Sequence, residues 1–397
     1  MHFFKDNELL CRFMAINICS GISIGMINFI IPLYALSLDA TSTEIGLIRG
    51  MMGVGDLLIV LPAGFLVDHF GSRRMYSVST CIGLVTILLL TLAKSPGMLL
   101  WMIVFYGIAR TLRTTSLNAS FFKNITVIGI KKGGWFKGAV IIGVSFLGPL
   151  ISGVALLYMG YSDFFLFSCL FLLAPLAGLW LFARINGRDP VPVPSYAPGI
   201  IETAGYYRRL VQNRLLVSAT LTECMNSAFF ITFTAFITIF IVKDLGLSAG
   251  VAAILISLRG GASILSLLFG WRFLYRDHTG LCLISFLMTI VGLIMIGISS
   301  DITIIAVASV ILGTFSGLMT LVTFTDVGNI EGEKGKISSI FIIGSSAGGI
   351  IGPVLGGMIG DTFGIQAIFL AFIVPFLLIA LFYLLPGKNR EGSGEFC

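Results

Sequence analysis

Six charged side chains stand inside stretches of sequence that are otherwise apolar, and their chemistry limits what this chain can do. They are Arg49, Asp56, Arg110, Arg113, Glu223 and Arg259. A charge at the centre of a helix in lipid costs at least about 2.5–3.5 kcal/mol. We therefore expect these groups to face a wet central cavity or one another rather than lipid.

The four arginines of this set outnumber its two acids. A guanidinium group pairs a carboxylate or phosphate through parallel hydrogen bonds, so the excess of arginine predicts a cavity that attracts an anion. The alternative for each arginine is a salt bridge between helices, or a side chain that extends to the membrane surface. That alternative carries most weight for Arg113, at the end of its apolar stretch.

The two acids, Asp56 and Glu223, predict proton coupling, because an intramembrane carboxyl group can take up and release a proton during a transport cycle. Structural pairing with an arginine is an equally weighted interpretation. Asparagines add hydrogen-bonding groups to the same stretches. The predicted substrate-binding residues are Asn17, Asn28, Arg49, Arg110, Arg113, Asn226 and Arg259.

The sequence contains no recognisable arrangement of catalytic residues. The histidines His2, His69 and His278 lie near the ends of apolar stretches, and neither HExxH nor GxSxG occurs. No Walker-type phosphate-binding motif is present either. The sequence therefore predicts a protein that is not an enzyme, has no catalytic residues, holds no metal or cofactor and is not driven by ATP.

The elements that must position these residues are membrane-spanning helices. The chain is 57% hydrophobic and 11% charged, with a mean hydropathy of +1.02, whereas soluble domains carry about 25% charged residues. Its apolar runs approach the roughly 20 residues that a helix needs to cross a bilayer. Twelve spans are predicted, near 10–37, 45–67, 75–95, 97–117, 135–158, 162–183, 214–242, 249–273, 279–299, 302–326, 337–360 and 364–386.

Charge in the loops sets the expected orientation. Of the 25 basic residues, 19 fall in loops on the side of both termini and two, Lys94 and Lys243, on the other side. The positive-inside rule then places both termini in the cytoplasm, and we expect a bacterial inner membrane protein. Nucleic-acid binding is not predicted, because the basic residues form no continuous face.

The chain divides into two similar halves. Ser42 to Gly64 and Ser248 to Gly270 are equally long runs from a loop into the end of a span, and Gly-Pro pairs recur in the fifth and eleventh spans. The predicted fold is all-α, with two pseudo-symmetric six-helix bundles. We assign 1–183 and 214–388 to the bundles, 184–213 to a cytoplasmic linker rich in proline and arginine, and 392–397 to a flexible tail left by cloning.

A loop motif follows the second span and gives the most specific local signal. It comprises Gly64, Asp68, Gly71, Arg73 and Arg74. This pattern resembles the loop signature of the major facilitator superfamily of secondary transporters. The resemblance implies a gate, in which Asp68 contacts the start of the eleventh helix when the cytoplasmic side is closed. Gly64 is expected to allow close helix approach. The corresponding loop of the second half has Leu274 where the motif has its aspartate.

A second motif bends two helices. It consists of Gly148, Pro149 and Gly153 in the fifth span, and Gly352, Pro353 and Gly356 in the eleventh. Both copies resemble the Gly-Pro motif of the exporting, proton-antiporting branches of the same superfamily. Proline removes a helical hydrogen bond and bends the helix, whereas glycines let backbones touch. Ordinary packing glycines of a helix bundle remain the alternative.

The resemblance implies a central cavity lined by helices one, two, four and five and by seven, eight, ten and eleven. We therefore predict a monomeric secondary active transporter that works by alternating access. Proton-coupled export of a small organic anion or amphiphilic metabolite, such as a metallophore or a drug-like compound, is favoured. Proton-coupled uptake of an organic anion or siderophore is the alternative, and a membrane receptor or scaffold that does not transport is a remote one.

Overall fold

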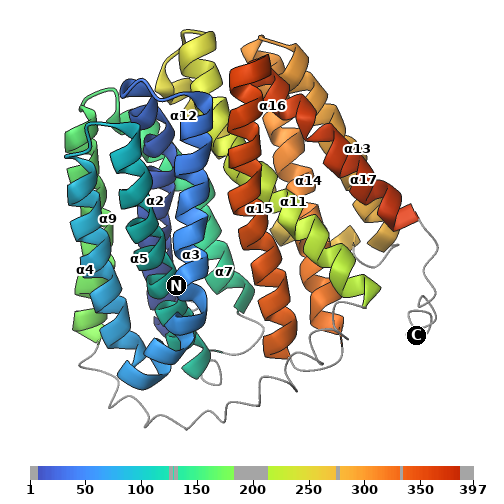
Figure 1. Cartoon of the computed structure of the whole chain (residues 1–397). Coiled ribbons are helices and arrows are strands. Elements are labelled where there is room, and N and C mark those ends of the chain that lie inside the picture. The colour runs from blue at the N-terminus through green and yellow to red at the C-terminus, as the bar shows by residue number, and fades with distance from the viewer. Residues whose placement is uncertain are drawn as a thin grey trace.

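The computed structural model describes residues 8–124, 128, 133–182, 213–273, 278–330 and 334–384. These residues form helices joined by short turns, and no strand occurs among them. The predicted linker, apart from Asn213, and the predicted tail at 392–397 lie outside the described residues. The helices stand side by side as two bundles (Figure 1).

The first half contains the helices that match the first six expected spans. They are α2 (Glu8–Ser37), α3 (Ser42–Phe70), α4 (Ser72–Leu90), α5 (Pro96–Lys123), a composite of α7 (Gly133–Ile141), η2 (Ile142–Leu147) and α8 (Gly148–Ala155), and α9 (Tyr161–Phe182). The composite is a single rod in which η2 is one π-helical segment. Its continuity follows from the N–H of Gly148, which donates to the carbonyl of Gly143 five residues earlier.

The second half repeats this order. Its helices are α11 (Arg214–Ile239) continued by η3 (Phe240–Asp244), α12 (Ala249–Phe269) continued by η4 (Gly270–Phe273), α13 (His278–Ile298), α14 (Ile302–Asn329), α15 (Lys334–Phe363), and α16 (Ile365–Ala371) followed by α17 (Ile373–Leu384). Each of the twelve expected spans is therefore occupied by helix. The expected spans and the observed helices begin and end within a few residues of one another.

Length and hydropathy qualify nine of the described helices as membrane spans, or ten if the two parts of α3 count as one bent span. The bend in α3 measures 51° between Ser42–Val60 and Pro62–Phe70. Proline at position 62 accounts for it, because proline cannot donate the hydrogen bond that holds a straight helix. The remaining two expected spans are α5 and α9, which pack against α4 and α2 respectively.

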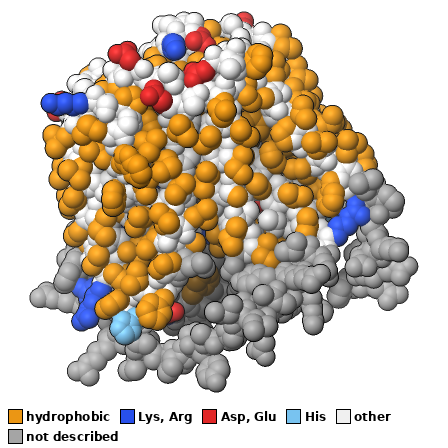
Figure 2. Space-filling model, in the orientation of Figure 1, with side chains coloured by type: hydrophobic (Ala, Val, Ile, Leu, Met, Phe, Trp, Pro, Cys, Tyr) orange, Lys and Arg blue, Asp and Glu red, His pale blue; other side chains and the backbone are white. Residues whose placement is uncertain are grey.

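The outer surface agrees with a lipid environment. A broad band of hydrophobic side chains covers the visible face of both bundles, whereas the charged side chains of that face lie above and below the band (Figure 2). We call the end where α2 begins, α9 ends and α11 begins the linker end. The opposite end carries six acidic residues and two basic ones, namely Asp39, Glu44, Asp163, Asp244, Asp301 and Asp361 with Lys94 and Lys243.

Helices of the two halves contact each other at several places, including α2 with α11. α3 packs against α15, and α12 packs against η2 and α8. The Ser257 hydroxyl of α12 donates to the Phe146 carbonyl of η2 at 3.0 Å, and Gly260 leaves no room for a side chain against Ser145. These contacts bring the fifth and eighth spans together at mid-height.

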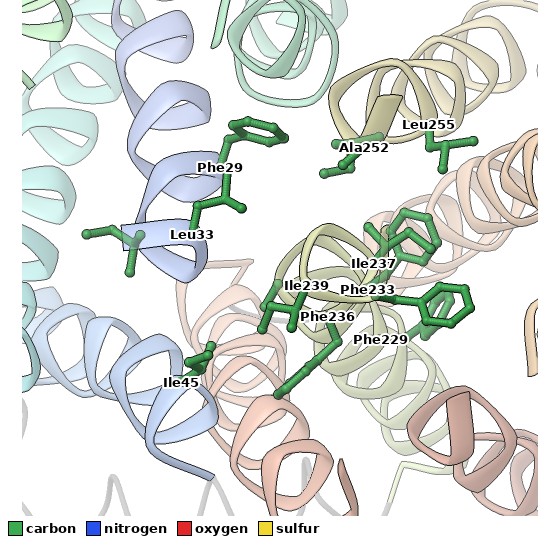
Figure 3. Close-up of a cluster of buried hydrophobic side chains, with 14 of the residues drawn as sticks. Phe29, Leu33, Ile45, Phe229, Phe233, Phe236, Ile237, Ile239, Ala252 and Leu255 are labelled. Atoms are coloured by element: carbon green, nitrogen blue, oxygen red, sulfur yellow. The ribbon is translucent and has the colours of Figure 1, made fainter. Parts of the chain in front are cut away.

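One apolar cluster extends through both halves near the opposite end. Phe29 and Leu33 of α2 lie near Phe236 and Ile239 of α11, with Ile45 of α3 below them in the close-up (Figure 3). Each of these side chains is buried. Apolar burial therefore holds the halves together at that end.

Candidate functional site

A cavity of about 250 Å³ lies between the halves, lined mainly by α11, α12, α14 and α15, with Ile141 and Ser145 from the first half. Polar and charged side chains form part of its wall, among them Glu223, Asn226, Arg259, Ser316, Thr320 and Ser345. Among the described residues, this cavity brings three of the predicted site residues together.

Arg259 lies in the middle of α12 and is only 3% exposed. Its guanidinium carbon sits 5.3, 5.0 and 5.1 Å from the ring centres of Phe229, Phe230 and Phe233 on α11. Aromatic faces attract a cation, so this cage orients the charge without neutralising it. Within the described part of the chain no carboxylate lies within 4 Å of Arg259, and its Nε and Nη2 have no hydrogen-bond partner.

Asn226 ties α11 to α14 beside this arginine. Its side-chain amide donates to the Thr320 hydroxyl at 2.8 Å and accepts from the Ser316 hydroxyl at 2.5 Å. These bonds fix which way the amide points. The amide also donates to the Ser316 carbonyl at 3.4 Å. Asn226 therefore helps to set the shape of the cavity wall that Arg259 also lines.

Glu223 lies one helical turn from Asn226 on α11 and lines the same cavity. The Ser345 hydroxyl of α15 donates to its Oε1 at 3.4 Å, whereas its buried Oε2 has no hydrogen-bond partner among the described residues. Lys137 of α7 interacts electrostatically with Glu223 from the other half. The Lys137 ammonium also lies 5.4 Å from the ring centre of Phe324 on α14.

The first-half charges form a separate cluster. Arg110 of α5 makes an ion pair with Asp56 of α3, and the Thr111 hydroxyl donates to the same carboxylate at 2.5 Å. The two side chains of the ion pair are 21% and 16% exposed. Arg49, which is 2% exposed, donates to the Asn28 side chain at 3.0 Å. In this conformation Arg110 points to Asp56 and is not among the residues that line the cavity beside Arg259, so its predicted part in substrate binding stays a prediction.

Arg113 is packed inside the first bundle rather than at a cavity. It is 1% exposed, and its Nε donates to the Ser20 hydroxyl of α2 at 3.1 Å. The hydroxyl groups of Tyr76 and Tyr106 are buried near it. The remaining predicted cavity residue, Asn17, donates to the Phe136 carbonyl at 3.1 Å and joins α2 to α7. Both side chains therefore contact neighbouring helices, and the buried Nη1 and Nη2 of Arg113 have no hydrogen-bond partner among the described residues.

The predicted gating loop is formed by the end of α3 and the start of α4. Gly71 has a φ of 87°, which favours glycine and lets the chain reverse between the two helices. Asp68 and Arg74 are exposed, and Arg73 is half-buried. A side chain at Gly64 would meet nothing within 4 Å, so close helix approach at Gly64 is not seen in this conformation. The bend at Pro62 separates this segment from the straight part of α3. The start of α15 is the partner of Asp68 that the family resemblance implies. It includes Ile337, whose side chain is buried, whereas the side chains of Lys334, Lys336 and Ser338 lie outside the described set.

The Gly-Pro segments act as packing surfaces. Added Cβ atoms at Gly143 and Gly148 would each come within 3 Å of α2, and one at Gly153 would lie 2.5 Å from Ala253 of α12. In the eleventh span, Gly352 and Gly356 pack against Ala228 and Thr232 of α11. Pro149 follows the π-helical segment, whereas Pro353 lies within the continuous helix α15.

Sequence reasoning missed the aromatic cage and the hydroxyl groups around it. A signal was present, since Asn226, Phe229, Phe230 and Phe233 recur at helical spacing and share a stripe of α11. The partners Ser316, Thr320 and Ser345 carried no local signal. They lie about 90 to 120 residues away from Asn226 and Glu223 in the chain and are found only through the fold.

Comparison with known proteins finds transporters that are similar in sequence and in fold. The chain is 22% identical over 380 residues to a probable nitrate transporter, NarT, of Staphylococcus epidermidis, covering 92% of each protein. The structure resembles the nucleoside transporter NupG, with a TM-score of 0.76, 13% identity and coverage of 94% and 98% of the two chains. It also resembles a bacterial homologue of the human lysosomal transporter Spinster, with a TM-score of 0.72, 16% identity and coverage of 95% and 96%.

The family model described as Major Facilitator Superfamily matches residues 13–328 and, in a second overlapping match, residues 220–395. These matches span most of the chain and include both bundles. The helical fold, the two repeated halves and the polar cavity between them agree with that match. The chain is an integral membrane transporter of the major facilitator superfamily, and not an enzyme.

Proposed function

We propose that this protein is a proton-coupled secondary transporter of a small monovalent anion, which binds at Arg259. The observation that carries the proposal is the buried guanidinium of Arg259, which lines a cavity and has no carboxylate beside it in the described structure. A buried charge is costly unless it is paired. A bound anion would supply the missing partner.

The size of the cavity supports a small substrate. Its volume of about 250 Å³ is below the roughly 300–1,000 Å³ of sites for drug-sized ligands. Nitrate, which the name of the staphylococcal relatives specifies, is a small planar monoanion, and a short carboxylate has similar geometry. Within the expected range of substrates we therefore favour small inorganic and organic anions over metallophores and drug-like compounds.

Glu223 is the residue to which we assign proton coupling. It lines the same cavity as Arg259, and Lys137 approaches it from the other half. Proton binding at Glu223 would change the charge of the cavity by one unit, and so change the attraction for an anion. Asp56 is held by Arg110 and Thr111, which favours a structural role for that acid.

The orientation follows from loop charge. The linker end carries most of the basic loop residues, so we assign it to the cytoplasm, together with both termini of a monomer in a bacterial inner membrane. Export remains the favoured direction, on the strength of the Gly-Pro segments in the fifth and eleventh spans. Substrate and protons would then move in opposite directions.

The proposal is tested by anion binding to purified protein. We expect nitrate or acetate to raise the melting temperature of the wild-type protein, because a ligand that binds only the folded state stabilises it. Arg259→Lys keeps the charge but loses the planar donor pair, and should weaken binding by about 1–3 kcal/mol.

Arg113→Lys is the matched control, because Arg113 is equally buried but does not line the cavity. It should bind the anion as the wild type does. Methyl acetate, the uncharged ester of acetate, should show the same affinity for the wild type and for both lysine variants. Equal loss of anion binding in the two lysine variants would contradict the proposal.

A further inference from the structure

The contact between α3 and α15 at the opposite end is unusually specific. The Asp361 carboxylate, in the last turn of α15, accepts from the backbone N–H of Ser42 and of Thr43, each at 2.8 Å. These are the first two residues of α3. The first amides of a helix have no partner within the helix and carry its positive dipole, so a carboxylate binds them well.

Within α3 itself, no capping group binds the backbone N–H groups of Ser42 and Thr43 among the described contacts. Its own capping box uses Thr41 and Glu44, whose backbone amides and side chains bond to each other. The N–H groups of Ser42 and Thr43 lie between those two residues, and they are bonded to Asp361. The helix start in one half is therefore completed by a side chain of the other half.

Backbone packing beneath this contact has no room for side chains. A Cβ atom at Gly46 would lie 2.2 Å from the Pro353 carbonyl oxygen, and one at Gly357 would lie 2.4 Å from the Ser42 carbonyl oxygen. α3 and α15 must approach closely before Asp361 can reach the start of α3. The contact therefore reports that the two halves are closed at the opposite end.

The same residue pattern stands at the other end of this helix pair. Gly64, Asp68, Phe70 and Gly71 end α3 with the spacing that Gly357, Asp361, Phe363 and Gly364 have at the end of α15. Each aspartate lies two residues before the last residue of its helix. The glycines that follow the two helices have nearly equal φ angles, 87° for Gly71 and 88° for Gly364.

α3 and α15 are antiparallel neighbours (Figure 1), so the end of each helix lies on the side where the other begins. The family resemblance already implies that Asp68 contacts the start of α15 when the linker end is closed. We propose that Asp361 is the counterpart of Asp68: it caps the start of α3 as a latch and holds the opposite end closed, so that the two contacts form in alternate conformations. In the present structure the Asp361 latch is made and Asp68 is exposed. This inference rests on the proposed function as a transporter, with alternating access as the mechanism that the sequence analysis predicts.

The test measures the separation of the halves at the opposite end. The native cysteines are first replaced by serine. Spin labels are then attached at Lys94→Cys in the first half and at Ser300→Cys in the second half, where both positions are exposed. Pulsed electron–electron double resonance gives the distribution of distances between the two labels. Asp361→Asn should raise the ratio of long to short distances by about tenfold.

Asp301→Asn is the matched control at the same end. Asp301 also accepts from a helix-start amide, that of Thr303 at 2.7 Å, but it caps its own helix α14 within one half. Its loss should leave the distances unchanged. Asp68→Asn should shift the ratio in the direction opposite to Asp361→Asn, and the double variant should return towards the wild type.

Ser42→Pro provides a second route in case Asp361→Asn does not fold. It removes one N–H that the latch needs, at the first helical position, where proline is well tolerated. The proposal is overturned if Asp361→Asn and Ser42→Pro give the distance distribution of Asp301→Asn, or if Asp68→Asn and Asp361→Asn shift it in the same direction. The distances are measured without substrate, so failure of the anion proposal leaves this result interpretable.

Discussion

Arg110 and Arg259 each lie near the middle of a helix, yet the structure gives them different surroundings. Arg110 is bound by Asp56, whereas Arg259 is surrounded by three phenylalanine rings and a cavity. A salt bridge satisfies a charge permanently, but an aromatic cage leaves it available to a ligand. The anion hypothesis therefore depends on Arg259 and no longer on the number of arginines.

Glu223→Gln tests proton coupling at the level of one residue. The substitution keeps size and hydrogen bonding to Ser345 but cannot carry a proton. In liposomes we expect pH-gradient-driven anion flux to be lost, while exchange of labelled for unlabelled anion continues. Flux that still follows an imposed pH gradient in this variant would remove Glu223 from the coupling mechanism.

Asp56→Asn is the companion variant, because Asp56 is the other predicted proton carrier. It leaves Arg110 without its carboxylate, so we expect a loss of stability of about 1–3 kcal/mol, reduced from the fully buried case by partial exposure. Driven flux should persist in the protein that folds. A loss of driven flux at unchanged stability would transfer the coupling role from Glu223 to Asp56.

The sequence could identify these charged residues but not their partners. Hydropathy marks a charge inside an apolar run, and helical spacing places Asn226 on the stripe of Glu223. Which neighbour Arg110 or Arg259 meets depends on the rotation of each helix about its axis. That rotation is decided by packing among segments that are distant in sequence, as with Asp56 and Arg110, 54 residues apart.

At the scale of elements, the span positions were predictable because bilayer thickness fixes helix length. The π-helical segment η2 could not be predicted from the sequence. In a regular α-helix, residues five apart point about 140° away from each other, yet Gly143 and Gly148 both pack against α2. The wider turn of η2 brings these two glycines to one face, and hydropathy contains no trace of it.

Two glycines of α3 give an element-scale prediction. Gly46→Ala places a Cβ atom 2.2 Å from the Pro353 carbonyl oxygen, so α3 and α15 must separate. We expect a lower melting temperature and a larger separation of the halves at the opposite end, measured with the same spin-label pair. The matched variant Gly64→Ala points into open space and should be neutral, or stabilise by up to about 1 kcal/mol through helix propensity.

If both alanine variants behaved alike, close packing of α3 on α15 would not govern closure. The comparison is sharp because both positions lie on one helix and undergo the same substitution. Only the surroundings differ, on the two sides of the bend at Pro62.

At the scale of the whole molecule, the proposed orientation can be measured directly. Lys94 and Arg74 are both exposed, at the opposite end and the linker end respectively. In a background without native cysteines, Lys94→Cys should react with a membrane-impermeant maleimide in intact cells, and Arg74→Cys only after permeabilisation. The reverse pattern would invert the topology, and with it the assignment of export.

The acidic face at the opposite end would affect how fast the proposed anion moves. Six acidic residues and two lysines lie at that end of the helices. Their field repels an anion that approaches, and salt screens it over about 8 Å at physiological ionic strength. If the substrate is the proposed anion, its entry from that side should slow in dilute buffer and recover as salt is added, whereas entry from the basic linker side should change in the opposite sense. The surface field would then make the two entry rates unequal, although it cannot alter the equilibrium set by the gradients.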